Sequence, residues 1–185
     1  YIVEQEDKLQ NLQNLIKLGV YVDVISSNDY YHPKLTSTVA VYVRLIDSHH
    51  GFIIPINHDE GINVSKDRIY ELLLSASKLY TLDKKALLYH FNLQDAIDLS
   101  LLYSMTKYER LEYSKDLSTI NFFYNKFQDF KNINELIPLS KLYESCEKAY
   151  EKVQDIIKYD IPSGFDFYNK TATNVFFLLE QSGHG

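Results

Sequence analysis

The sequence predicts a mixed α/β domain, and three observations support this fold class. Short runs rich in β-branched residues occupy 20–24, 38–46 and 52–56. Stretches with apolar residues at helical spacing precede and follow these runs. The chain has 185 residues, 45% hydrophobic and 24% charged, which suits one soluble domain with a real core. We therefore expect a sheet flanked by helices.

The first third of the chain predicts a helix followed by three strands. A helix over 4–18 ends at Gly19 in the usual C-terminal manner. The run 20–24 predicts a strand buried on both faces, with Asp23 near its end. A turn at 26–33 leads to the strongest strand, 38–46, and a hairpin leads to 52–56. Pro55 places that last strand at an edge of the sheet or marks its end.

The rest of the chain is predominantly helical in pattern. Ser65 and Asp67 are both plausible N-caps for the first of these helices. We expect helices at 68–80, 95–105, 135–159 and 165–181, one short buried strand at 86–89, and a linker at 160–164.

Charge and cysteine content exclude several classes of protein. With 25 acidic and 19 basic side chains the net charge is -6, unlike the basic surface of a free-standing nucleic-acid binder. Contact with nucleic acid would need a local basic patch, metal ions or a basic partner domain. Cys146 is the single cysteine, so neither an internal disulfide nor a Cys-based zinc site is expected.

No secretion signal or membrane partner is expected from the sequence. No run approaches the ~18 apolar residues of a membrane span, and the first ten residues, YIVEQEDKLQ, are too charged for a signal peptide. We expect a cytoplasmic protein of bacterial type, associated with the nucleoid, or a protein of an organelle. Both ends resemble cuts, which predicts a fragment of a longer polypeptide.

Four motifs occur in an order that points to one family. They are GFIIPINHDEG (51–61), ALLYHFNLQD (86–95), Tyr143 followed by Glu147 four residues later, and FFLLEQSG (176–183). Together with the helix and strands that precede them, these motifs resemble the 3′–5′ exonuclease domain of DNA polymerase I and its family A relatives. The resemblance implies a ribonuclease H-like mixed sheet flanked by helices, and a polymerase domain that follows in cis.

The resemblance also implies a set of site residues. In that family four carboxylates hold two divalent metals, and a tyrosine orients the attacking water. Asp23, Asp95, Tyr143 and Glu147 match those positions, while Ile25 replaces the glutamate that would partner the first aspartate. We therefore expect a vestigial site without a metal, with Asp23 and Asp95 as the ligands if any metal binds. Mg²⁺ is implied only for the polymerase domain.

Each of these residues also has a structural explanation. Asp23 could be a turn residue and Asp95 an N-cap, while Tyr143 and Glu147 could be core and surface positions of one helix. His49, His50 and His58 surround the hairpin, but no fourth zinc ligand is apparent. The aromatic residues of 122–130 could stack on single-stranded bases or pack against the sheet.

The resulting hypothesis is an exonuclease-like domain at 1–160, followed at 161–185 by a linker and the start of a helix leading into a polymerase domain. It would lack proofreading activity, support DNA synthesis in replication or repair as a structural module, and meet DNA through the polymerase. Two alternatives stay open. One is an active metal-dependent exonuclease in which Asp29 or Asp98 supplies a missing carboxylate. The other is a non-catalytic interaction module of a replication complex.

Overall fold

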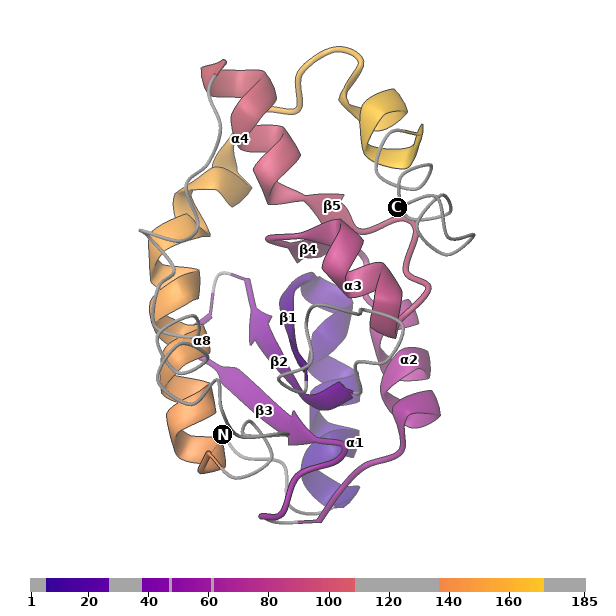
Figure 1. Ribbon diagram of the computed structural model, residues 1–185. Coiled ribbons are helices and arrows are strands. Elements are labelled where there is room, and N and C mark those ends of the chain that lie inside the picture. Colours follow the sequence, from indigo (N-terminus) through magenta and orange to yellow (C-terminus); the bar gives the residue numbers. More distant parts are fainter. Residues whose placement is uncertain (1–5, 27–37, 47, 61, 109–136, 172–185) are drawn as a thin grey trace, which may run out of the picture.

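The computed structural model of the chain describes residues 6–26, 38–46, 48–60, 62–108 and 137–171. Figure 1 shows a twisted sheet with helices packed on both of its faces. The strands are β1 (Val20–Ser26), β2 (Thr38–Leu45), β3 (Gly51–Pro55), β4 (Leu79–Thr81) and β5 (Ile97–Asp98). The helices are α1 (Glu6–Leu15), α2 (Lys66–Leu74), α3 (Lys84–His90), α4 (Leu99–Lys107) and α8 (Leu139–Val153). Short 3₁₀ helices, η1 (Ile16–Leu18) and η3 (Gln154–Lys158), follow α1 and α8.

The sheet confirms the predicted fold class. Its strand order is β3-β2-β1-β4-β5, with β1, β2 and β3 forming an antiparallel meander. β4 and β5 continue the sheet on the other side of β1 and run parallel to it. A meander of three strands followed by two parallel strands, with helices on both faces, is the ribonuclease H-like arrangement. Parallel strands need crossover connections, and α2 and α3 provide them.

Two apolar cores lie on opposite faces of the sheet. Alternate side chains of β1 point to opposite sides, so Val20 and Val22 pack with α1, α2 and α3, whereas Tyr21 and Ile25 pack with α4 and α8. Figure 1 shows α8 along one side of the sheet and α1 and α2 on the other. Because both faces are covered, β1 is a buried central strand, as its continuous apolar run predicted.

Several local predictions are confirmed. Gly19 adopts a φ of +106° after η1, a conformation that favours glycine. β2 and β3 form the predicted hairpin, and Pro55 is the last residue of β3, which is an edge strand. Of the two candidate N-caps for α2, Ser65 is the one used, because its side chain accepts a hydrogen bond from the backbone N–H of Arg68.

The fourth strand was predicted in the wrong place. Residues 86–89 belong to α3, and the strand is the three-residue β4, which overlaps the end of the region that the pattern assigned to one long helix over 68–80. α2 ends at Leu74, and Ser75 is its C-cap. The alternative of Asp95 as an N-cap is also wrong, since Asp98 caps α4 with its side chain.

The residues that follow α8 pack onto the same domain up to the end of the described region. Residues 165–171 are helical, and Phe165 is buried with the side chains of α4 and α8. The Asn169 side chain donates to the backbone oxygen of Ala96 (2.9 Å) and accepts from the backbone N–H of Asp98 (3.0 Å). An amide side chain thus bonds to the outer edge of β5 as a neighbouring strand would. The domain division expected at residue 160 stays a prediction.

Some predictions fall on residues outside the described ranges. They include the turn after Ser26 with Asp29, the aromatic segment 122–130 and the C-terminal motif 176–183. In the described ranges, no helix combines the length and apolar character that a membrane crossing requires.

Candidate functional site

Asp23 lies within β1 on the face that α8 covers. Its carboxylate accepts a 2.9 Å hydrogen bond from the hydroxyl of Tyr21, two residues earlier on the same face. Burial raises the pKa of Asp23 to about 6, the Tyr21 hydrogen bond opposes that rise, and the charge of Asp83 adds to it. The sequence placed Asp23 near the strand end, but β1 continues to Ser26.

Asp83 and Asp98 are two further carboxylates, and the charge of Asp83 acts on Asp23. Asp83 follows β4 and caps α3, accepting from the backbone N–H of Ala86 at 3.2 Å. Asp98 ends β5 and caps α4. Burial raises the pKa of Asp98 to about 6, and the charge of Asp83 raises it further, while backbone hydrogen bonds oppose the rise. Asp83 therefore lies within electrostatic range of both other carboxylates.

Asp95, the predicted second ligand, is not brought into this group. It lies in the loop between α3 and β5, its side chain is 97% exposed, and its contact is a 3.9 Å approach from Lys170. The family motif was matched to a strand at 86–89 that is in fact helix α3. With β4 at 79–81, the carboxylate that follows the observed fourth strand is therefore Asp83.

Glu147 on α8 accepts hydrogen bonds from two side chains of β2. One carboxylate oxygen accepts from the Tyr42 hydroxyl at 2.5 Å, and the other accepts from Arg44 Nη1 at 2.5 Å. The Arg44 and Glu147 side chains are only 10% and 21% exposed. Arg44 also donates through Nε and Nη2 to the backbone oxygen of Ser48 and lies 4.6 Å from the Tyr150 ring centre. Glu147 is therefore one partner of a largely buried ion pair with Arg44.

Tyr143 and Ile25 occupy the remaining family positions. Tyr143 packs edge-on against Tyr42, with ring centres 5.8 Å apart. Ile25 is 3% exposed and packs in the core between the sheet and α8. Ile25 thus places methyl groups on the same strand face as Asp23, where the resemblance requires a carboxylate.

Gly51 is the first residue of β3 and lies against the side chains of Glu147, Tyr143 and Tyr42. A Cβ built there would meet Glu147 Oε1, the Tyr143 hydroxyl at 3.0 Å and the Tyr42 hydroxyl at 3.1 Å. Only a glycine leaves room for three polar side chains to converge on the hairpin. The sequence offered this glycine as a hairpin residue, without indicating its contact with α8.

The histidine of the GFIIPINHDEG motif anchors α8 to the sheet. The His58 ring bonds through Nε2 to the Ile137 carbonyl (2.6 Å), and its Nδ1 accepts from the backbone N–H of Glu60 (2.9 Å). The Glu60 side chain accepts from the backbone N–H of Leu139, the first residue of α8. The loop after β3 therefore fixes the start of the helix that carries Tyr143 and Glu147.

These contacts occupy the ring of His58, one of the three histidines around the hairpin. Both ring nitrogens of His58 have protein partners, and in the described ranges no group of three or more His, Cys, Asp or Glu side chains could hold a metal ion. His49 and His50 are exposed. Asp83 interacts electrostatically with both Asp23 and Asp98.

His90, which the resemblance aligned with a family histidine, has a structural role. Its two ring nitrogens bond to the hydroxyls of Ser26 (2.9 Å) and Thr38 (2.7 Å), at the end of β1 and the start of β2. Burial and the charge of Lys66 lower the pKa of His90 to about 4. The neutral ring therefore ties α3 to two strands.

Sequence reasoning missed Asp83, Tyr42 and Arg44. The signal for Asp83 was the Ser-rich break at 75–77, which ends α2, followed by the run LYTLD (79–83) and a new apolar helix pattern. Tyr42 and Arg44 alternate with valines in β2, which predicted their common face. Nothing in the pattern indicated which helix that face would meet.

The sequence matches no protein-family model and no curated protein. Among solved structures it is similar to the crystal structure of the catalytic core of RRP6 from Trypanosoma brucei, in a cysteine-to-serine variant, with a TM-score of 0.49 and 11% identity. The match covers 97% of this chain and 49% of that one, so the chain spans about half the length of that structure. The fold assignment rests on the sheet order and helix layers described above.

Proposed function

We propose that this chain is the 3′–5′ exonuclease-like domain of a DNA polymerase I-type enzyme, and that it supports DNA synthesis as a structural module without proofreading. The ribonuclease H-like sheet and the order of the other three sequence motifs, 51–61, Tyr143 with Glu147, and 176–183, support this assignment. In this proposal DNA is contacted through the polymerase domain in cis, which also binds Mg²⁺. The protein acts in the cytoplasm at the nucleoid, or in an organelle.

The observation that carries the proposal is the state of Glu147. Hydrolysis with two divalent metals needs several carboxylate oxygens that converge on the ions. Here each oxygen of Glu147 already accepts a hydrogen bond, one from the Tyr42 hydroxyl and one from the Arg44 guanidinium. Arg44 already supplies the positive charge that a metal would otherwise provide to this carboxylate. Releasing Glu147 to a metal would break a largely buried ion pair.

Ile25 supports the same conclusion on β1. The side chain two residues beyond Asp23 is apolar and 3% exposed, within the core between the sheet and α8. An oxygen ligand at this position would require a carboxylate in that core, where desolvation disfavours charge. Of the residues that the resemblance aligns with metal ligands, Ile25 on β1 is thus apolar, and the charge of Glu147 on α8 is neutralised by Arg44.

A second candidate function is a metal-dependent exonuclease with rearranged carboxylates. Asp23, Asp83 and Asp98 favour it, because the charge of Asp83 raises the pKa of both of the others. A divalent cation would relieve that repulsion and lower both values. The sequence already offered Asp98 as a substitute ligand. Asp83 is a further candidate because it follows the observed strand β4.

A nuclease assay separates the two candidates. The full-length protein is incubated with a primer–template carrying a mismatched 3′ end, with Mg²⁺ or Mn²⁺ and without deoxynucleotides. Asp23→Ala and Asp83→Ala are compared with Asp155→Ala, a change at an exposed aspartate of η3. We expect the same background removal of the 3′ nucleotide from all four proteins. Metal-dependent removal that only Asp23→Ala and Asp83→Ala abolish would establish the second candidate.

The polymerase part of the proposal has its own assay. With deoxynucleotides and a matched primer–template, the full-length protein is expected to extend the primer in a template-directed manner. Failure to extend would contradict the polymerase assignment, whatever the nuclease assay shows.

A further inference from the structure

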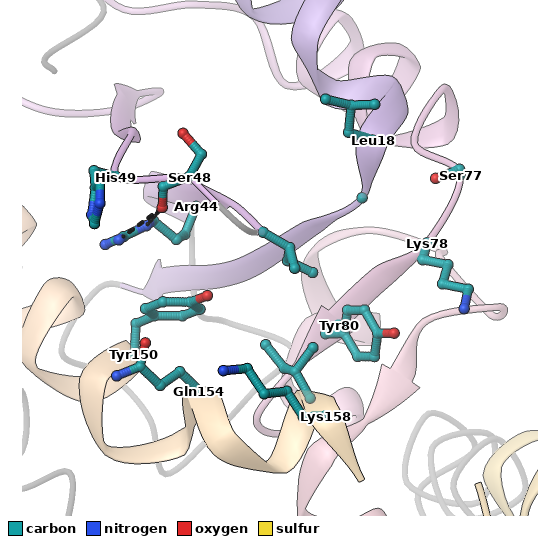
Figure 2. A pocket seen from close by; sticks show the side chains of 13 residues that line it. Leu18, Arg44, Ser48, His49, Ser77, Lys78, Tyr80, Tyr150, Gln154 and Lys158 are labelled. Atoms are coloured by element: carbon teal, nitrogen blue, oxygen red, sulfur yellow. Dashed lines mark hydrogen bonds between the residues drawn. The ribbon is translucent and has the colours of Figure 1, made fainter. Parts of the chain in front are cut away.

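A pocket lies at the N-terminal end of β1. It has a volume of about 600 Å³ and is lined by Leu18, Gly19, Arg44, Ile46, Ser48, His49, Ser77, Lys78, Tyr80, Tyr150, Gln154, Ile157 and Lys158. We call it the basic pocket. Gly19 precedes β1 and Lys78 precedes β4, so the pocket opens beside the N-terminal ends of these two parallel strands. Figure 2 shows its lining side chains.

The charge of the basic pocket is opposite to that of the chain. Its described lining residues include Arg44, Lys78 and Lys158 and no carboxylate, whereas the chain as a whole carries -6. Arg44 is neutralised by Glu147, but within the described ranges neither lysine forms an ion pair. Two lysines therefore concentrate positive charge on a hollow of an otherwise acidic protein.

Cationic side chains are spread along the pocket on both sides of Tyr80. In Figure 2 Lys158 extends from α8's continuation, η3, between Tyr150 and Tyr80, while Lys78 lies at the Tyr80 side and His49 at the Arg44 side. The hydroxyl-bearing Ser48 and Ser77 and the amide of Gln154 add neutral donors to the lining. Ammonium groups and hydroxyls are the side chains that bind phosphate oxygens.

We propose that the basic pocket binds one nucleotide through its phosphate, either as a free nucleoside monophosphate or as one unit of a single strand. The volume of about 600 Å³ falls in the range of small-molecule sites and exceeds what a bare phosphate requires. The chain thus has the local basic patch that nucleic-acid contact requires of an acidic protein. This proposal stands on the pocket alone and does not depend on the proposed function.

Binding is tested on the full-length protein with three probes: inorganic phosphate, thymidine monophosphate and a fluorescent single-stranded dT₁₂. Lys78→Glu/Lys158→Glu reverses both free charges and is compared with Lys148→Glu/Lys152→Glu, a matched reversal at exposed positions of α8 outside the pocket. Because all four lysines are exposed, both doubles are expected to fold, which circular dichroism and melting temperature check.

We expect the pocket double variant to weaken binding of the nucleotide probes by at least about tenfold at 0.1 M salt, and the control double to change it by less than threefold. Saturable binding of both thymidine monophosphate and dT₁₂ identifies a nucleotide site, and binding of dT₁₂ alone identifies a strand site. Binding of neither would overturn the proposal. Equal losses in the two double variants would also overturn it, since they would show a general charge effect, and so would equal affinity for inorganic phosphate.

Discussion

Arg44 Nη1 lies 2.5 Å from a carboxylate oxygen of Glu147, joining β2 to α8 across 103 residues of sequence. The same glutamate accepts from Tyr42, so two adjacent inward positions of β2 hold one residue of α8. This pair occupies the helix position at which the family resemblance expects a metal ligand. A carboxylate that would bind a metal ion in a nuclease here binds the guanidinium of Arg44.

The first prediction concerns the stability that this ion pair contributes. Glu147→Gln keeps an acceptor for Tyr42 but leaves the Arg44 charge without its partner. Because the pair is largely buried, we expect the free energy of unfolding to fall by about 2 kcal/mol in urea denaturation. Glu144→Gln, which removes the exposed pair with Lys141, should change it by less than about 0.5 kcal/mol. Equal effects of the two substitutions would contradict a special role for Glu147.

The second prediction concerns Gly51, which lies against Glu147. The added methyl of Gly51→Ala would collide with Glu147 Oε1 and crowd the hydroxyls of Tyr143 and Tyr42. We expect a loss of about 1–3 kcal/mol in the free energy of unfolding. Since Glu147→Ala removes the colliding atom, the double variant Gly51→Ala/Glu147→Ala should lose at least about 0.5 kcal/mol less than the sum of the singles. A loss in the double variant equal to the sum of the two single losses would show that the added methyl at position 51 does not collide with Glu147.

The third prediction concerns the pH dependence that Asp23 imposes. Its pKa is raised to about 6 in the folded protein from an ordinary value of 3.8. The folded state therefore keeps its proton to higher pH than the unfolded state, and the stability of the protein falls as pH rises between these values. Above pH 6 the full cost of the buried charge is present.

Asp23→Asn removes this cost while keeping an acceptor for Tyr21. Its free energy of unfolding relative to the unmodified protein should rise between pH 4 and pH 7, reaching a gain of about 2 kcal/mol or less because the carboxylate is partly exposed. Denaturation at several pH values measures the difference, with Asp155→Asn as an exposed control. A difference that does not change with pH would show that Asp23 ionises normally in the folded protein.

Much of the fold could be predicted from the sequence, and the exceptions have a physical cause. β1, β2 and β3 were found because β-branched residues dominate them, and Gly19 and Pro55 mark their borders. β4 was missed because three residues are too few to show a period of two. Its Leu79 and Tyr80 also continue the apolar spacing of α2, so the pattern extended the helix through the strand.

The candidate site was less predictable than the fold. The expected second carboxylate, Asp95, was chosen by its distance from a strand at 86–89, whereas the carboxylate that follows the observed β4 is Asp83. Asp23 lies on a predicted strand, and Tyr143 and Glu147 lie on a predicted helix. Their partners could not be predicted, since the pairing of Arg44 with Glu147 depends on how α8 crosses the hairpin, which local sequence patterns do not encode.

The measurement that tests the central claim most directly is Mn²⁺ binding by calorimetric titration of the full-length protein and of Asp23→Ala/Asp83→Ala. The account holds that no metal binds at these carboxylates, because Ile25 and the Arg44–Glu147 pair leave too few oxygen ligands. It predicts the same number of Mn²⁺ ions bound, with the same affinities, in both proteins. Loss of one or more Mn²⁺ sites in the double variant would contradict the account and restore a metal centre on β1.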